Sequence, residues 1–178
     1  MSSFIMNTYN RYPVSFVNGK GSWLKSENGD DYLDFAAGIA VNILGHNHPK
    51  LNKAMIENVD KIWHLSNLYK IPEQEKLAEK LCSLSFAEKV FFCNSGAEAV
   101  EGAIKVARKY FYSKGETLRN EIITFSGSFH GRTLATLAAA GNPNYSEGFG
   151  PMPEGFISVP FADHDAFKRA INKNTAAV

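Results

Sequence analysis

The stretch VFFCNSGAEAVEGAIKVARKYF, residues 90–111, constrains the fold more than any other part of the chain. A short apolar run ends abruptly at Asn94-Ser95-Gly96, and a helical pattern follows without a spacer. Apolar residues then recur at spacings of three and four, as on one face of an amphipathic helix: Ala97, Val100, Ile104, Ala107 and Phe111. A strand, a tight turn and a helix in direct succession is the unit from which α/β proteins are built.

The rest of the chain after residue 40 continues the alternation of helices and β-rich runs. Helices are predicted for residues 49–62 and 72–84, each opening on a proline, which suits the first turn of a helix. Strands are predicted for residues 89–93, 121–125 and 156–161, and helices for 96–111, 133–140 and 163–172, the last capped by Asp163 or Asp165. Residues 174–178 begin a further apolar run, so we expect a truncated chain. This order predicts an α/β fold with a mainly parallel sheet.

The first 40 residues differ from this pattern and are expected to form a separate N-terminal segment, with the α/β domain spanning residues 41–178. Residues 22–35 predict a β-hairpin, because Asn28-Gly29 is a strong turn signal between two β-rich runs.

Composition narrows the class of protein. Hydrophobic residues make up 44% of the chain and charged residues 21%, as in a globular protein in solution. The net charge of +1 gives no basic surface typical of nucleic-acid binding, and no apolar run is long enough to span a membrane. The two cysteines form no framework, which favours a reducing, cytoplasmic compartment.

The turn at Ser95 has two interpretations that need not exclude each other. Ser95-x-x-Glu98 is a capping box, in which a serine caps the first helical amides and a glutamate reaches back. The same helix N-terminus presents free N–H groups and a positive dipole, and Gly96 lets an anion approach the backbone. Parallel α/β sheets bind ligands at the carboxyl ends of their strands, which is where this turn is expected. Phosphate is the ligand that such a helix N-terminus favours.

A second loop, SGSFHGRT, follows the strand predicted at residues 121–125. Phe129 is either a core residue or a ring that packs on a flat ligand, and Arg132 is either a surface cation or a bidentate partner for a carboxylate. A phosphate turn and an aromatic–arginine loop on neighbouring strands favour a flat, phosphorylated ligand beside a carboxylate substrate.

His46 and His48, in GHNHP, invite a metal interpretation, but no third ligand stands at a usual spacing. Capping of the helix at Pro49 by Asn47 or His48 explains this motif better, and no metal is expected.

Three motifs, GHNHPKL, CNSGAEAVEGAIKVARKY and TFSGSFHGRTLATL, resemble in order and spacing the class III (ornithine/acetylornithine-type) aminotransferases, pyridoxal-phosphate enzymes of fold type I. The resemblance covers essentially the whole chain and implies the first part of the large cofactor-binding domain. It is strongest to the enzymes that move the δ-amino group of N-acetylornithine to 2-oxoglutarate in arginine biosynthesis. Aminotransferases for ornithine, succinyldiaminopimelate or 4-aminobutyrate stay open as alternatives, as does a non-catalytic fragment acting in binding. The resemblance also implies a cytoplasmic homodimer.

The resemblance assigns roles to particular residues. Ser95, Gly96 and Ala97 match the turn that holds the cofactor phosphate, Phe129 the aromatic that stacks on the pyridine ring, and Arg132 the arginine that binds the substrate α-carboxylate. Tyr9 matches a tyrosine near the substrate, with Tyr12 close enough to leave the register open. Residues 66–70 match a region near the dimer interface.

The resemblance implies three parts of the family's enzymes that these 178 residues do not include. The resemblance places the lysine that bonds to the cofactor, the aspartate that pairs with the pyridine nitrogen and the small C-terminal domain beyond residue 178. No catalytic residue is therefore assigned in this chain, and the chain alone is expected to be inactive.

Overall fold

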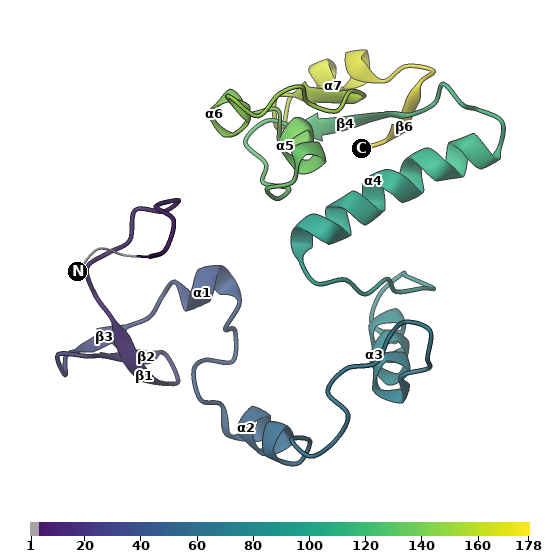
Figure 1. Ribbon diagram of the computed structural model, residues 1–178. Helices are drawn as coiled ribbons and strands as arrows, with labels where there is room; N and C mark the ends of the chain where they lie inside the picture. Colours follow the sequence, from purple (N-terminus) through teal and green to yellow (C-terminus); the bar gives the residue numbers. More distant parts are fainter. Residues whose placement is uncertain (1–3) are drawn as a thin grey trace. The chain divides into compact units, whose positions relative to one another are not determined.

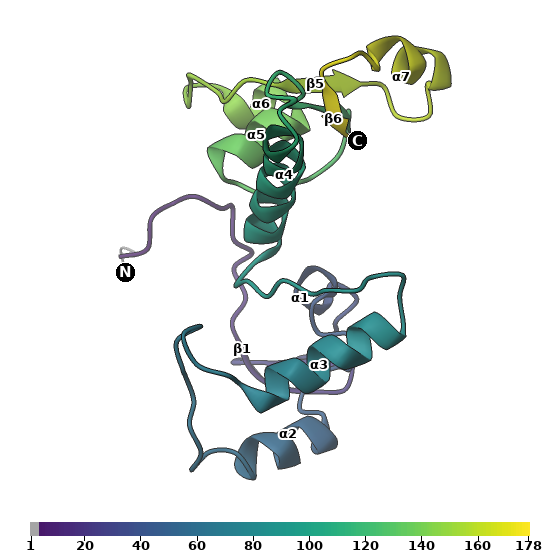
Figure 2. The ribbon, with the colours of Figure 1, turned by 90° about the vertical axis from the view of Figure 1, so that its right-hand side faces the viewer.

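The computed structural model describes residues 4–178. It divides into two compact units, one up to Pro72 and one from Glu73 to Val178 (Figures 1 and 2). The boundary that we expect between residues 40 and 41 stays a prediction.

The first unit contains a three-stranded antiparallel sheet with the strand order β1-β2-β3. Its strands are β1 (Phe16–Lys20), β2 (Trp23–Ser26) and β3 (Asp31–Leu33). The predicted hairpin is confirmed as β2 and β3, with Lys25 opposite Asp31. Its turn spans four residues, and of Asn28 and Gly29 only Gly29 has a positive φ, 90°. The sequence pattern did not indicate β1.

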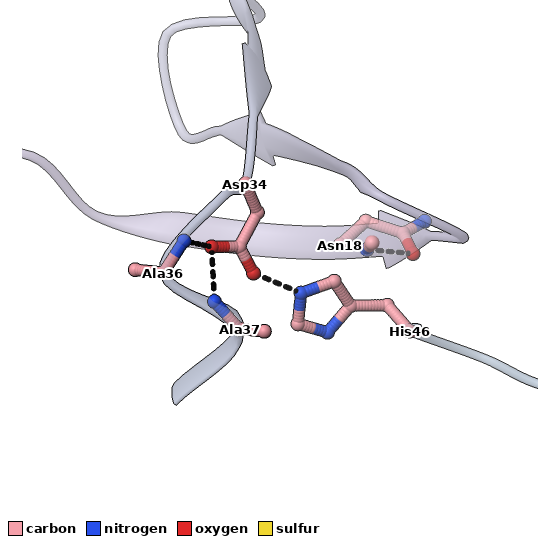
Figure 3. A network of polar contacts seen from close by, with 6 residues as sticks. Asn18, Asp34, Ala36, Ala37 and His46 are labelled. Atoms are coloured by element: carbon pink, nitrogen blue, oxygen red, sulfur yellow. Dashed lines mark hydrogen bonds and ion pairs between the residues drawn. The ribbon is translucent and has the colours of Figure 1, made fainter. Parts of the chain in front are cut away.

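A polar network joins the end of this sheet to the loop that follows (Figure 3). The Asp34 carboxylate accepts hydrogen bonds from the amides of Ala36 (3.0 Å) and Ala37 (2.8 Å) and lies 2.7 Å from His46 Nε2. The His46 hydrogen bond, followed by that from the Ala37 amide, holds the pKa of Asp34 below its ordinary value. The backbone of His46 pairs with that of Gly21, so His46 closes the loop onto the sheet.

The helices of the first unit are short. Helix α1 (Ala37–Ala40) is a single turn with positive φ angles, and α2 (Pro49–Ile56) ends before Val59 and Ile62, which the apolar spacing places on the same helix face. The stripe is exposed along α2, and a helix of this length depends on packing for its stability. Of the two predicted capping residues, His48 rather than Asn47 occupies the N-cap position of α2, but its side chain makes no capping hydrogen bond.

The second unit is built on a parallel sheet with the strand order β5-β4-β6. The strands are β4 (Glu121–Phe125), β5 (Phe156–Val159) and β6 (Thr175–Ala177). The helices are α3 (Pro72–Ser83, whose first residue closes the first unit), α4 (Gly96–Ser113), α5 (Leu134–Ala140), α6 (Pro143–Ser146) and α7 (His164–Ala170). The predicted α/β fold with a parallel sheet is confirmed. Asp163, not Asp165, caps α7 by accepting from the Ala166 amide at 2.8 Å.

The core of the second unit lies between the central strand and the helices beside it. Helix α4 runs along one side of the strands and α7 lies on the other (Figure 1). Buried apolar side chains come from α4, α5 and the strands: Ile104, Ile122, Ile123, Leu137, Ala139, Ala140 and Val159. The buried hydroxyl of Thr124 donates to the carbonyl of Ala139 at 2.6 Å, which fixes the end of α5 against β4.

The strand predicted for residues 89–93 is wrong. These residues pair with no strand in the described part of the chain, and both Phe91 and Cys93 are exposed. A β-strand is defined by hydrogen bonds to a neighbour, so an apolar run alone does not make one.

Candidate functional site

Ser95 and Glu98 cap the N-terminus of α4, as the sequence predicts. Ser95 Oγ accepts from the Glu98 amide at 3.2 Å. The Glu98 carboxylate, however, accepts from the amide of Asn94 at 2.5 Å, one residue before the capping serine. The hydrogen bonds from Asn94, backbone first and side chain second, hold the pKa of Glu98 below its ordinary value.

This shifted capping box leaves three successive backbone donors available. Within the described residues, the amides of Ser95, Gly96 and Ala97 have no hydrogen-bond partner in the preceding turn, since the two backbone capping bonds are donated by the amides of Glu98 and Asn94. Gly96 is exposed, and a Cβ added there would meet no atom within 4 Å. An anion therefore has both donors and room at the start of an 18-residue helix.

The loop between β4 and α5 lies directly against this turn. A Cβ built on Gly131 would stand only 2.7 Å from the Ala97 Cβ and 3.0 Å from the Ala97 Cα. Gly131 has a φ of 127°, which side chains rarely adopt. Because the loop follows the carboxyl end of β4, this contact places the α4 N-terminus at the same edge of the sheet, where α/β proteins bind ligands.

A part-buried hydrogen-bond chain strengthens the contact. The hydroxyl of Thr133, the N-cap of α5, donates to Glu101 of α4 at 2.6 Å and accepts from the Thr136 amide at 3.3 Å. The i, i+4 spacing of Glu101 and Lys105 favours an ion pair, but within the described residues none forms between them. The Glu101 carboxylate faces the loop instead. The first two turns of α4 are thus tied to the loop twice.

The loop carries the two residues that the sequence selects for ligand binding. The Phe129 ring is 66% exposed, so it is not the core residue of the alternative interpretation. The Arg132 guanidinium is also exposed and lies over that ring, with its Cζ 5.7 Å from the ring centroid. Beside them, Ser128 donates its only hydroxyl proton to the Phe125 carbonyl, so His130 Nε2 is the donor in their 2.9 Å contact.

The structure thus brings Ser95, Gly96 and Ala97 together with the loop of Phe129 and Arg132, while their ligand roles stay predictions. Tyr9 belongs to the first unit, where it is exposed, as is Tyr12, and its role also stays a prediction. Sequence reasoning missed three residues that shape the site: Glu101, Gly131 and Thr133. Thr133 precedes an apolar helical run, the usual signal of an N-cap, whereas nothing local indicates the contacts of Gly131 or Glu101.

A metal site requires several ligating side chains close together, and a membrane-spanning helix requires length and apolarity. No group of three or more His, Cys, Asp or Glu side chains within residues 4–178 is arranged to hold a metal ion. In the same residues, no helix has the length and apolarity needed to cross a membrane.

The second unit thus combines a parallel α/β sheet, a helix N-terminus with available backbone donors and an aromatic–arginine loop at one sheet edge. The family model for class-III aminotransferases matches residues 4–178, and the chain belongs to this family. Members of the family depend on pyridoxal phosphate and have the type I fold.

Among curated relatives, the acetylornithine aminotransferase of Agrobacterium fabrum (strain C58) is 58% identical over 98% of this chain and 44% of its own length. That of Rhodobacter capsulatus is 52% identical over the whole chain and 45% of its own length. The chain therefore spans less than half the length of the curated relatives it matches.

Solved structures agree with the family assignment. The ornithine aminotransferase of Toxoplasma gondii, whose active site carries pyridoxal phosphate at partial occupancy, matches 98% of this chain and 42% of its own chain with a TM-score of 0.92 and 26% identity. The N-acetylornithine aminotransferase of Stenotrophomonas maltophilia matches 90% of this chain and 39% of its own, with a TM-score of 0.73 and 38% identity.

Proposed function

We propose that the full-length protein is a pyridoxal-phosphate-dependent aminotransferase that moves the δ-amino group of N-acetylornithine to 2-oxoglutarate. The observation that carries this proposal is the 58% identity to an acetylornithine aminotransferase over 98% of the chain. The products are N-acetylglutamate semialdehyde and glutamate, which places the reaction in arginine biosynthesis. We further propose a homodimer in the cytoplasm.

The residues at the sheet edge fit the phosphate of the cofactor. The amides of Ser95, Gly96 and Ala97 are available as donors, and the open space at Gly96 admits an anion close to the backbone. The positive end of the α4 dipole adds to the attraction. These three residues would therefore hold the phosphate without a positively charged side chain.

Phe129 and Arg132 supply the other contacts. The exposed ring of Phe129 would stack on the flat pyridine ring, and the guanidinium of Arg132 would bind the α-carboxylate of the substrate through paired N–H donors. When bound, pyridoxal phosphate supplies an electron sink for the amino transfer. The part played by these residues is to bind and orient the two reactants, which brings them into reacting geometry.

The choice of amino donor is tested by donor profiling of the full-length protein. N-acetylornithine should give a higher kcat/KM than ornithine, 4-aminobutyrate or succinyldiaminopimelate, with 2-oxoglutarate as acceptor. A preference for ornithine would overturn the substrate while leaving the reaction class intact. The absence of activity with every donor, in protein loaded with cofactor, would instead favour a non-catalytic binding role.

A further inference from the structure

Three arginines of the second unit lie over aromatic rings, and one of them differs from the other two. Arg108 lies over Phe156 at 5.2 Å, and its guanidinium donates to the carbonyls of Asn120 and Glu154 at 3.1 and 2.8 Å. Arg119 is likewise stacked and hydrogen-bonded. These two guanidinium groups already use donors within the fold.

The guanidinium of Arg132 is stacked but uncommitted. Its Cζ lies 5.7 Å from the ring centroid of Phe129 and 5.3 Å from that of Tyr145, so it contacts two rings. No hydrogen bond or ion pair to this guanidinium occurs within residues 4–178. Aromatic contact engages the faces of a guanidinium and leaves the in-plane N–H groups available.

The fold holds Tyr145 at this place through contacts remote from the loop. The C-cap of helix α5 is Gly141, whose left-handed backbone (φ 61°) packs so closely on β5 that an added Cβ would lie 2.9 Å from the Ser158 Cβ. Asn142 then caps α6, accepting from the Asn144 amide at 3.0 Å, and its carbonyl accepts from the Tyr145 amide at 3.0 Å. The ring of Tyr145 is 39% exposed and is presented by this anchored turn.

We propose that Tyr145 is a positioning residue that, together with Phe129, orients the Arg132 guanidinium so that its in-plane donors meet a substrate carboxylate. The inference rests on the proposed function, because it takes Arg132 to be the carboxylate receptor. A flexible arginine loses side-chain entropy when it binds, and a second aromatic contact reduces that loss by holding the side chain in place beforehand. Tyr145 acts through its ring face and not through its hydroxyl.

The test measures binding of glutarate, which has the two carboxylates of 2-oxoglutarate but no reactive carbonyl, to the cofactor-loaded full-length protein by calorimetry. Tyr145→Leu should raise the Kd about two- to fivefold, the effect of one cation–π contact, whereas Tyr145→Phe should bind like wild type. Phe156→Leu, which removes a ring beneath Arg108 instead, is the matched control and should leave the Kd unchanged. If Tyr145→Leu lowers the cofactor content, Tyr145→Met replaces it.

A double-mutant cycle separates positioning from general structural support. Arg132→Gln alone should weaken glutarate binding about tenfold or more, because the charged bidentate contact is lost. In the Arg132→Gln background, Tyr145→Leu should cause no further loss. An additive loss, or equal weakening by Tyr145→Phe and Tyr145→Leu, would overturn the positioning role. An unchanged Kd in Arg132→Gln would reject Arg132 as the carboxylate receptor, and this part of the proposed function would then fail. The Tyr145 variants test only the positioning role, so the two failures can be told apart.

Discussion

Gly131 and Ala97 touch so closely that Gly131 has no room for a side chain: a Cβ on Gly131 would lie 2.7 Å from the Ala97 Cβ. The two residues belong to different segments: Ala97 lies in the first turn of α4, and Gly131 lies in the loop between β4 and α5. Their contact makes a single candidate site out of two separate motifs.

Substitution of Gly131 by alanine should push the loop between β4 and α5 away from the N-terminus of α4. Gly131→Ala combines strain at a φ of 127° with steric overlap against Ala97, and we expect it to lower the free energy of unfolding by about 2–4 kcal/mol. Gly127→Ala is the matched control, because Gly127 also has a positive φ (80°) but nothing within 4 Å of a Cβ. Denaturant unfolding of the full-length protein measures both. Equal losses would show that the contact with Ala97 contributes nothing.

Acid should weaken the N-terminus of α4 through Glu98. The pKa of Glu98 in the fold is lowered by the Asn94 hydrogen bonds, so their stabilisation is fully present above the ordinary value of 4.5 and is lost as the pH falls through the lowered value. Glu98→Gln should therefore be less stable than wild type at pH 7, and the difference should shrink as the pH falls below 4.5. Thermal unfolding across this range checks it, with Glu79→Gln on α3 as the control. A constant difference would contradict the capping role.

Removal of the Phe129 ring should weaken cofactor retention. Within residues 4–178, Phe129 is exposed and makes only the contact with Arg132 among aromatic and charged groups, so Phe129→Ala is expected to leave the fold intact. Loss of one stacking face should raise the apparent Kd for pyridoxal phosphate about tenfold, in the range of aromatic contacts of about 1 kcal/mol or more. The cofactor absorbance after dialysis of the full-length protein measures this. Full retention in the variant would exclude stacking.

The 178-residue chain produced alone should associate with itself. An apolar groove of about 640 Å³ lies between α4 and the strands, lined by Ile104, Phe125, Phe156 and Val178 among others. The edge strand β6 adds unpaired backbone N–H and C=O groups, and Phe91 adds exposed apolar surface. Sedimentation velocity should show concentration-dependent association, and a monodisperse monomer that unfolds cooperatively would contradict this prediction.

Local patterns predict most of the second unit because its elements depend on neighbours in sequence. The apolar spacing from Ala97 to Phe111 and the N-cap at Ser95 are sufficient to place α4. The failures arise where structure depends on distant partners. Residues 89–93 have the composition of a strand but pair with no neighbour among the described residues, and α2 ends before the apolar stripe does, where the stripe is exposed.

The candidate site likewise contains residues that a local sequence pattern indicates and residues that only a distant contact places. Ser95, Gly96, Phe129 and Arg132 stand in recognisable motifs, and the sequence alone is sufficient to select them. Tyr145 has no such signal, because its place beside Arg132 depends on the turn that Gly141 makes against Ser158. Contacts of that kind are fixed by packing across the sheet.

The central claim is that the two loops bind cofactor and substrate through different residues, and Arg132→Ala in the full-length protein tests it most directly. The variant is assayed for its KM for N-acetylornithine, and the cofactor absorption spectrum is recorded on the same sample. We predict that the KM rises at least about tenfold, as expected for loss of a charged bidentate contact, while the spectrum is unchanged. An unchanged KM would contradict the assignment of Arg132 to the substrate carboxylate.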